Sequence, residues 1–282
     1  MLEIRPVTDG DIDGICRFLE LHLGRGMRAE EHQRLFTYPW MNDKPGKGYI
    51  MVDGCRIVGF LGGIYADRAI QGRIERVCNL TTWCVLPEHR GNSISLLFAM
   101  INNSKQTVTN LSPTPVVEKM LRALRYEVLD TYKLFSLPLT HLQTLLTFPK
   151  AKITTDSDLI GKALTPEDRC LFDDHQGTGC GHLLMSLPER YCYAVWKRRK
   201  KKGISFSEIL YIRNPDIFLQ HLELARLHIL WRDRTWLLAV DERLLGGRRP
   251  ALVWPYRRVS MFKSLSLKRE DIDNLYSELA IR

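Results

Sequence analysis

Several familiar signatures are missing from this chain of 282 residues. It has no uninterrupted apolar run of about 18 residues, which is the length that a membrane-spanning helix needs. Its first residues, MLEIRPVTDGDIDG, are acidic where a secretory signal would be basic and then apolar. We therefore expect no membrane span and a cytoplasmic location.

Motifs for disulfides and for common nucleotides are also missing. The seven cysteines, from Cys16 to Cys192, are odd in number and include no CxxC pair. They are expected to be small apolar fillers in a reducing compartment. The sequence contains neither GxxxxGK[ST] nor GxGxxG after a strand, which argues against a nucleotide hydrolase and against a dinucleotide oxidoreductase.

Basic residues outnumber acidic ones, which gives a formal net charge of +9. That balance favours anionic partners without choosing among nucleic acid, anionic lipid and phosphorylated small molecules. Six consecutive basic residues occupy Lys197–Lys202 and precede Gly203. Because no aromatic residues are interleaved with them, we expect a solvated hairpin turn or strand end and no nucleic-acid partner.

Apolar periodicity predicts alternating strands and helices. In the first half, strands are expected at 2–8, 48–53, 55–70, 73–87, 106–112, 126–130 and 132–139, and helices at 9–23, 29–40, 93–103 and 114–125. In the second half, strands are expected at 191–199, 204–214 and 235–245, and a helix at 216–233.

This order predicts an α/β fold with a mixed sheet and helices on both faces. The pattern loosens between residues 140 and 158, so the domains are placed at 1–140 and 158–282. Strand, strand, helix, strand in the second half matches the middle of the first half, which indicates an internal pseudo-repeat of element order. The second copy has YIRNPDIF, without glycine, at the place of the first copy's turn.

That turn, PEHRGNS, lies between an expected strand and an expected helix. Helix N-termini carry unpaired backbone N–H groups and a partial positive charge, which suit phosphate oxygens. Arg90, Gly91, Asn92 and Ser93 would form such a cradle, with Arg90 adding a fixed positive charge. A capped helix with nothing bound is the alternative.

The turn resembles the pyrophosphate-binding turn of the GNAT acetyltransferase superfamily, in which a V-x-P-E-x-R-G strand end leads into a Q/R-x-x-G-x-G/A turn. The resemblance covers Met1 to about Leu139, and it includes IRPVTDGDIDGI, YIMVDGCRIVGFLGG and PTPVVEKMLRALRYEVLD. It implies a mostly antiparallel sheet flanked by helices, in tandem if the second half is a degenerate copy. It also implies acetyl-CoA as co-substrate.

The resemblance further assigns residues to the acetyl-CoA site. Backbone groups of the strand end would hold the thioester oxyanion and pair with the pantetheine arm, and the turn would hold the pyrophosphate. These residues are Cys84, Val85, Leu86, Arg90, Gly91, Asn92, Ser93 and Thr114. The sequence departs from the family pattern at Glu88, Ser93, Leu121, Thr114 and Arg125-Tyr126, and Leu121 excludes a tyrosine general acid there.

Amine acetylation also needs a proton acceptor. Residues alternate faces along the strand before the turn, and Glu75 is the one carboxylate on its face, which Asn79 shares. In the family, bases often lie on this strand and act directly or through a chain of waters. Glu75 is therefore the candidate base, and Asn79 would position water or substrate. An ion pair of Glu75 with Arg73 or Arg76 is the alternative, and Ser112 or Thr114 would offer a hydroxyl near the sulfur.

The second half offers one further constellation, DDHQGTGCGH. His175, Cys180 and His182 have no spacing typical of a metal site, so no metal is expected and an ordinary glycine-rich loop is the simpler interpretation. A third option is that this loop helps to build the acceptor pocket, with His175 or His182 as base.

Together these observations predict an enzyme that transfers acetyl from acetyl-CoA to a primary amine of a small molecule by direct attack. A nucleotide-linked amino sugar is one candidate acceptor. Two alternatives stay open: a non-catalytic acyl-CoA-binding or scaffold protein of the same fold, and a longer-chain N-acyltransferase. The oligomeric state is left open.

Overall fold

The computed structural model describes residues 1–282 except 25, 41–45, 102–105, 138–150 and 202. Position 140, the end of the first predicted domain, lies outside the described residues, as does Lys202. Within the described part, the chain forms two compact units. Unit 1 contains residues 1–127, 261–268 and 276–282, and unit 2 contains residues 128–260 and 269–275.

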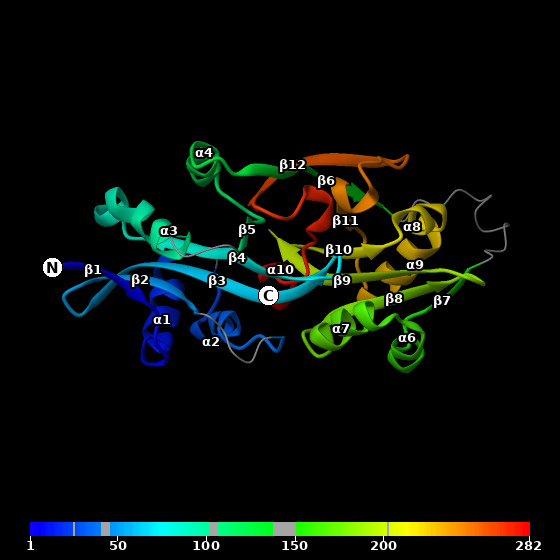
Figure 1. The fold of residues 1–282 in the computed structure, drawn as a ribbon, viewed down its shortest axis with the longest axis horizontal. Helices are drawn as coiled ribbons and strands as arrows, with labels where there is room; N and C mark the ends of the chain where they lie inside the picture. Colours follow the sequence, from blue (N-terminus) through cyan, green and yellow to red (C-terminus); the bar gives the residue numbers. More distant parts are fainter. Residues whose placement is uncertain (25, 41–45, 102–105, 138–150, 202) are drawn as a thin grey trace. The chain divides into compact units, whose positions relative to one another are not determined.

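Unit 1 has helices around a strongly twisted set of strands (Figure 1). Its strands are β1 (Leu2–Pro6), β2 (Gly48–Asp53), β3 (Arg56–Ile70), β4 (Arg73–Val85) and β5 (Thr107–Asn110). Its helices are η1 (Asp9–Asp11), α1 (Ile12–His22), α2 (Ala29–His32), η2 (Gln33–Leu35), η3 (Pro87–Asn92), α3 (Ser93–Ile101), α4 (Pro115–Ala123) and α10 (Glu278–Ile281). The strands lie in the order β1-β2-β3-β4-β5, and β4–β5 is the parallel pair.

Unit 2 follows a similar order of elements. Its strands are β6 (Glu127–Ser136), β7 (Lys152–Thr154), β8 (Cys180–Ser186), β9 (Tyr191–Lys201), β10 (Ile204–Arg213), β11 (Leu238–Asp241) and β12 (Val253–Lys263). Its helices are α6 (Ser157–Ala163), α7 (Pro166–His175), α8 (Pro215–Gln220), α9 (Leu222–Asp233), η4 (Glu242–Leu245) and η5 (Arg269–Asp271). The strands lie in the order β6-β11-β10-β9-β8-β7, with β10–β11 parallel.

Two strands, β6 and β12, pair with strands that are distant from them in sequence. β6 follows α4 along the chain but pairs antiparallel with β11, so most of it belongs to unit 2. β12 begins in unit 2, and its residues 261–263 pair antiparallel with β5. The predicted α/β class with a mostly antiparallel sheet and flanking helices is confirmed.

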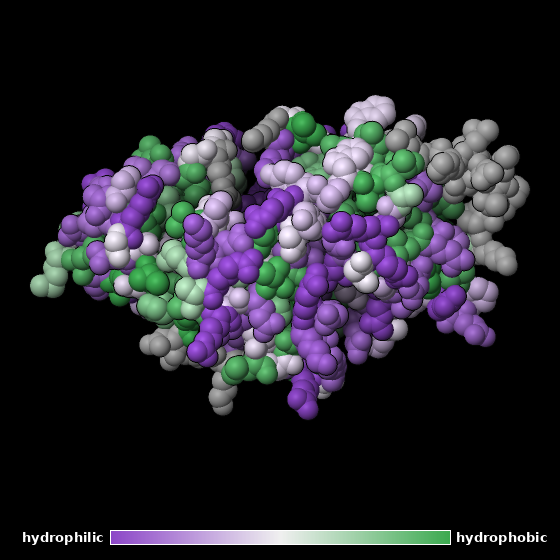
Figure 2. Space-filling model, turned by 90° about the horizontal axis from the view of Figure 1, so that it is seen from above, coloured by the Kyte–Doolittle hydropathy of each residue, from purple (hydrophilic) through white to green (hydrophobic). Residues whose placement is uncertain are grey.

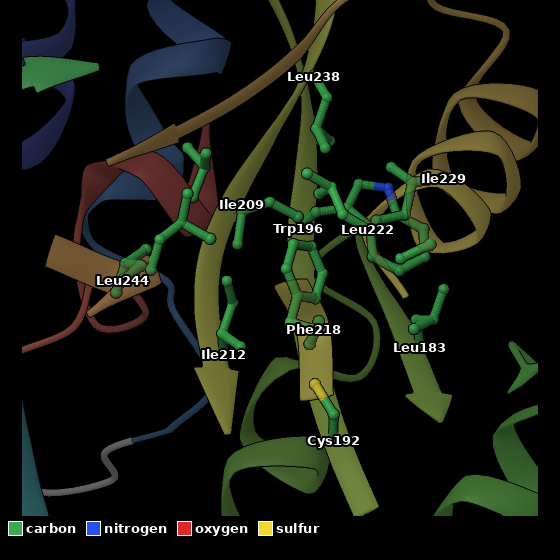
Figure 3. Close-up of a cluster of buried hydrophobic side chains, with 14 of the residues drawn as sticks. Leu183, Cys192, Trp196, Ile209, Ile212, Phe218, Leu222, Ile229, Leu238 and Leu244 are labelled. Carbon is green, nitrogen blue, oxygen red and sulfur yellow. The ribbon is translucent and has the colours of Figure 1, made fainter. Parts of the chain in front are cut away.

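The core of unit 2 forms around Trp196, which is fully buried on β9 (Figure 3). Side chains from α8, α9 and the central strands surround its ring, because an amphipathic helix buries its apolar stripe against a sheet face. Gly181 on β8 faces Trp196 in the strand pairing, and the ring packs directly on its backbone. A side chain larger than hydrogen does not fit there.

Some expected elements differ from the structure. The predicted helix 216–233 is two helices, because the backbone leaves helical geometry at His221. The two short strands predicted at 126–130 and 132–139 are one continuous strand, β6. The sequence prediction had no counterpart for β12 or α10, which come from the end of the chain.

The basic run lies where β9 ends, as expected, and Gly203 has the positive φ of a tight turn. The structure adds an aromatic neighbour that the local sequence does not show: Lys201 Nζ lies 5.5 Å from the centre of the Tyr256 ring. Hydrophilic side chains cover much of the face seen in Figure 2, with apolar groups between them. No helix in the described ranges is long and apolar enough to cross a membrane.

Candidate active site

Strands β4 and β5 separate after a short parallel pairing. Among the described residues, that pairing covers only Val77 to Asn79 on β4. A β-bulge follows, in which Thr82 and Trp83 oppose the single residue Leu61 of β3. Thr82 has φ of 55°, a conformation that a β-branched residue rarely adopts. From here to Val85, one edge of β4 is left without β5, and we call this opening the β4–β5 split.

Backbone alternation decides which β4 groups face the split. The Leu86 amide donates to the Val58 carbonyl at 2.9 Å, so it faces β3. Successive amides along a strand point to opposite edges, so the Cys84 amide also faces β3 and the Val85 amide faces the split. Of the three predicted oxyanion donors, Val85 is therefore the one available to a ligand, and Cys84 and Leu86 are corrected to sheet-pairing positions.

The turn after β4 is more regular than predicted. Residues 87–92 form the 3₁₀ helix η3, in which the His89 amide donates to Leu86 and the Ser93 amide donates to Arg90. The prediction that Ser93 offers a free amide to a phosphate is therefore wrong. Arg90, Gly91 and Asn92 are exposed, and a Cβ built on Gly91 meets no atom within 4 Å.

Thr114 lies at the N-cap of α4, and its side chain accepts from the Val117 amide at 3.4 Å. Its hydroxyl is therefore used as a helix cap. Leu121, at the position where a tyrosine was excluded, is completely buried. Thr114 stays a cofactor-site prediction through its position alone.

The split is bordered by α10, a segment from the end of the chain that belongs to unit 1. The Glu278 amide donates to Asn79 Oδ1 at 3.4 Å, and Arg282 Nη2 donates to Thr82 Oγ1 at 2.8 Å. Just before α10, the ring of Tyr276 makes an edge contact with Trp40, with ring centres 5.3 Å apart. These contacts fix α10 beside the first residues of the split.

Glu278 is the carboxylate that α10 brings to the split. Its side chain is buried, with 4% of the residue exposed. Oε1 accepts a hydrogen bond of 3.0 Å from Ser112 Oγ, and Oε2 has no hydrogen-bond partner among the described residues. A buried carboxylate oxygen without a donor is costly, so native proteins rarely keep one without a reason.

The predicted base, Glu75, lies too far from the split. It is seven residues before Thr82, where the split opens, on an extended strand, which corresponds to about 23 Å. Its Oε2 accepts from Ser266 Oγ at 2.7 Å, and the alternative partner Arg76 pairs with Asp67 at 2.7 Å. Direct contact of Glu75 with groups that react level with Thr82 is therefore ruled out by distance.

Asn79 does lie at the mouth of the split, but its amide is occupied. Nδ2 donates to Thr109 Oγ1 at 3.0 Å, and Oδ1 accepts from the Glu278 amide. The side chain is completely buried. Its geometry supports a positioning role through Glu278 instead of the predicted direct contact with water or substrate.

His175 is also placed differently from its prediction as a base. It is completely buried in unit 2, with Nδ1 2.9 Å from the Leu171 carbonyl and Nε2 3.1 Å from the Leu275 carbonyl. Burial lowers the pKa of His175, partly offset by these two carbonyls. Neither ring nitrogen is open to a substrate, so we remove His175 from the candidate site.

His182 and Cys180, the other two residues of that constellation, also make contacts within unit 2. His182 bonds through Nδ1 to the Tyr193 hydroxyl at 2.8 Å, and burial raises the pKa of the Cys180 thiol. In the described part of the chain, no three His, Cys, Asp or Glu side chains are grouped as metal ligands.

Comparisons with known proteins address the fold. No family model matches the sequence, and no curated protein matches it. Solved structures do match: a GCN5-related N-acetyltransferase from Anabaena variabilis has a TM-score of 0.58 and 11% identity, covering 93% of this chain and 72% of that one. This chain has the GNAT fold.

Two other structures extend the likeness. A GCN5-related glucosamine N-acetyltransferase region of a fungal multidomain β-N-acetylglucosaminidase has a TM-score of 0.60 and 11% identity, covering 93% of this chain and 38% of that chain. N-myristoyltransferase of Saccharomyces cerevisiae with bound myristoyl-CoA has a TM-score of 0.51 and 11% identity, covering 98% of this chain and 83% of that chain. Both described units therefore fall within the matched regions.

The GNAT fold of this chain has a second strand split, in unit 2. Parallel strands β10 and β11 pair only at Ser207 and Glu208 among the described residues, and a bulge at Leu210 follows. The Leu210 carbonyl accepts from the Asn274 amide at 3.1 Å, and Asn274 Nδ2 donates to Asp241 at 2.6 Å. Asn274 thus already bonds to the strand groups with which an extended ligand would pair in this second split.

Sequence reasoning missed α10 and therefore missed Glu278 as part of the site. The available signal was weak: one carboxylate stands among apolar residues in LYSELAI, close to the end of the sequence. Burial of that segment makes the carboxylate unusual. Sequence alone does not show that the segment is buried.

Proposed function

We propose that this protein is an acyl-CoA-dependent N-acyltransferase that moves an acetyl group from acetyl-CoA to a primary amine. The observation that carries the proposal is the β4–β5 split, with the Val85 amide on its open edge and the exposed turn of Gly91 beyond its end. An extended arm with amide groups pairs with such an edge as a strand does.

The dimensions of the split agree with the length of that arm. About twelve bonds join the pyrophosphate to the sulfur of coenzyme A, which an extended chain spans in about 14 Å. At ~3.3 Å per strand residue this equals about four residues of β4. An arm that starts beside Leu86 therefore brings its sulfur level with Thr82, at the bulge. The acyl group and the amine would then lie beside the residues of β4 that precede Thr82.

The chain's own residues would bind and orient the substrate. Arg90, with Gly91 and Asn92, would hold the pyrophosphate, since Arg90 is an exposed cation beside a small residue. Val85 would donate to the arm. The segment at the acyl end is buried protein, with Leu279 and Ala280 almost fully covered, and this favours a short acyl group. Unit 2 would support the fold without binding coenzyme A.

For the acceptor we propose only a chemical class, a primary amine of a small molecule. An amino sugar, including one carried on a nucleotide, is a reasonable first choice because the excess of basic residues suits its phosphates. A longer acyl group is the competing substrate, since one similar structure binds myristoyl-CoA.

The first experiment measures ligand stabilisation, since a ligand that binds the native state raises the unfolding midpoint. We expect acetyl-CoA and coenzyme A to raise it, and myristoyl-CoA to raise it no further than coenzyme A. Transfer is then measured as thiol release with glucosamine, a nucleotide-linked amino sugar and ethanolamine. A midpoint unmoved by saturating acetyl-CoA would reject the acyl-CoA proposal, and binding without transfer to any amine would favour the non-catalytic alternative.

A further inference from the structure

We propose that Ser112 and Glu278 form the proton-accepting pair of this active site, with Ser112 Oγ touching the amine and the buried Glu278 carboxylate taking up the proton. The inference rests on the proposed acyltransferase function. It assigns a direct proton acceptor to the split, since Glu75 is too distant to contact the reacting groups. Both ring nitrogens of His175 are already hydrogen-bonded within unit 2.

The position of Ser112 follows from the register of the two parallel strands. Thr109 of β5 pairs with Asn79 of β4, so a residue three positions further along the chain is level with Thr82. That residue is Ser112, just past the end of β5. It is exposed, and its amide is held by Asn110 Oδ1 at 3.2 Å. Ser112 therefore stands across the split from the place that the arm's length assigns to the sulfur.

Glu278 connects to both sides of the split. Its amide is held by Asn79 on β4, and its Oε1 accepts from Ser112 Oγ at 3.0 Å. Glu278 is buried, whereas Ser112 is an exposed residue. A substrate amine would therefore meet the hydroxyl first, and the hydroxyl would be the link to the carboxylate.

The direction of this hydrogen bond decides the chemistry. The hydroxyl donates to the carboxylate, so the pair is set to receive a proton from outside, and it is poorly set to protonate a departing thiolate. An alkyl amine is an ammonium ion at neutral pH and must lose one proton before it attacks. Ser112 Oγ takes that proton while its own moves to Glu278, which later returns it to solvent.

The remaining bonds balance without another reagent. The amine nitrogen forms a bond to the thioester carbonyl carbon, and the bond from that carbon to sulfur breaks. The second proton lost by the nitrogen leaves with the sulfur as the free thiol of coenzyme A. Asn79 acts through Glu278 and is a positioning residue.

The chain contains a matched control pair. Ser266 Oγ donates to Glu75 Oε2 at 2.7 Å, again an exposed serine on a carboxylate of unit 1, but away from the split. Four single variants are compared: Ser112→Ala and Glu278→Gln at the split, and Ser266→Ala and Glu75→Gln as controls. Glutamine keeps the shape of Glu278 and still accepts from Ser112, which protects the fold.

The assay measures kcat and KM for amine acetylation together with the rise in unfolding midpoint on adding acetyl-CoA. We expect each split variant to lower kcat about a hundredfold, within the usual range of acid–base catalysis, while the midpoint still rises as in the unchanged protein. The double variant should lose no more than the stronger single variant, because the two residues act as one unit. A merely structural role would instead lower the unfolding midpoint of the free protein and weaken its rise on adding acetyl-CoA.

The outcomes separate this inference from the function on which it rests. Full activity of Glu278→Gln, or equal losses in the control pair, overturns the proton-accepting pair while the acyltransferase proposal stands. If the unchanged protein neither gains stability from acetyl-CoA nor acetylates any amine tested, both proposals fail together.

Discussion

Glu208 of unit 2 offers a prediction whose size follows from the structure. It is completely buried on β10, and its carboxylate lies among three cations of the same unit. Lys133 Nζ contacts it directly, Arg258 Nη1 is 3.2 Å from Oε1, and Arg199 Nε is 3.6 Å from Oε2. The perturbation is Glu208→Gln, which keeps the shape and removes the charge.

The magnitude comes from the pKa of Glu208. Burial alone would raise it, but Lys133, Arg258 and Arg199 outweigh burial and lower it from 4.5 to about 2. At 1.36 kcal/mol for each pKa unit, the charged form contributes about 3 kcal/mol to the free energy of unfolding. Removing one member of a buried ion pair costs about 3–5 kcal/mol in other proteins, which agrees.

The same shift fixes the pH dependence. A carboxylate with a lowered folded-state pKa stabilises the protein above its unfolded pKa, and this contribution is lost as the pH falls through the folded pKa. For Glu208 the window runs from 4.5 down to about 2. The difference in unfolding free energy between the unchanged protein and Glu208→Gln should therefore be about 3 kcal/mol at pH 7 and shrink across that window.

Urea unfolding at a series of pH values measures this difference. Glu189→Gln is the control, because Glu189 is exposed and its loss should change stability by less than about 0.5 kcal/mol. A difference for Glu208 that stays constant between pH 7 and pH 2.5, or one below about 1 kcal/mol at pH 7, would refute the electrostatic reasoning. Unchanged affinity for acetyl-CoA in this variant is expected if unit 2 only supports the fold.

Two further predictions concern glycines. Gly91→Leu should leave the unfolding midpoint nearly unchanged, since a Cβ there meets no atom within 4 Å, yet weaken acetyl-CoA binding at least about tenfold if the phosphate approaches this backbone. Gly10→Leu in the 3₁₀ helix η1 is the matched control, and equal Kd values for both would remove the turn from the site. Gly181→Ala should destabilise the protein by about 1–3 kcal/mol, because its Cβ would lie 2.2 Å from Trp196 Cε2. Urea unfolding of Gly181→Ala beside Gly91→Ala checks this, and similar stabilities would contradict the close packing.

Local sequence patterns predicted most elements that build unit 1. The hairpin at Asp53-Gly54, the long strand β4 and the turn before α3 were predicted from apolar periodicity and turn residues, because these preferences act between neighbours in sequence. The turn PEHRGNS also carried the resemblance to the GNAT fold. Its hydrogen bonds were not predictable, since a 3₁₀ helix and an open cradle suit the same residues.

The sequence by itself predicted the fold class, a long strand over residues 73–87 and a turn with Gly91 before the next helix. The structure ends that strand at Val85. Only the tertiary structure decided which side chains accompany them. It separated Glu75 from the split, enclosed His175 between two carbonyls, and brought Glu278 to Ser112 across 166 positions of sequence. Such a contact depends on where α10 packs. That position is set by the packing of the whole unit, and residues that neighbour α10 in sequence do not reveal it.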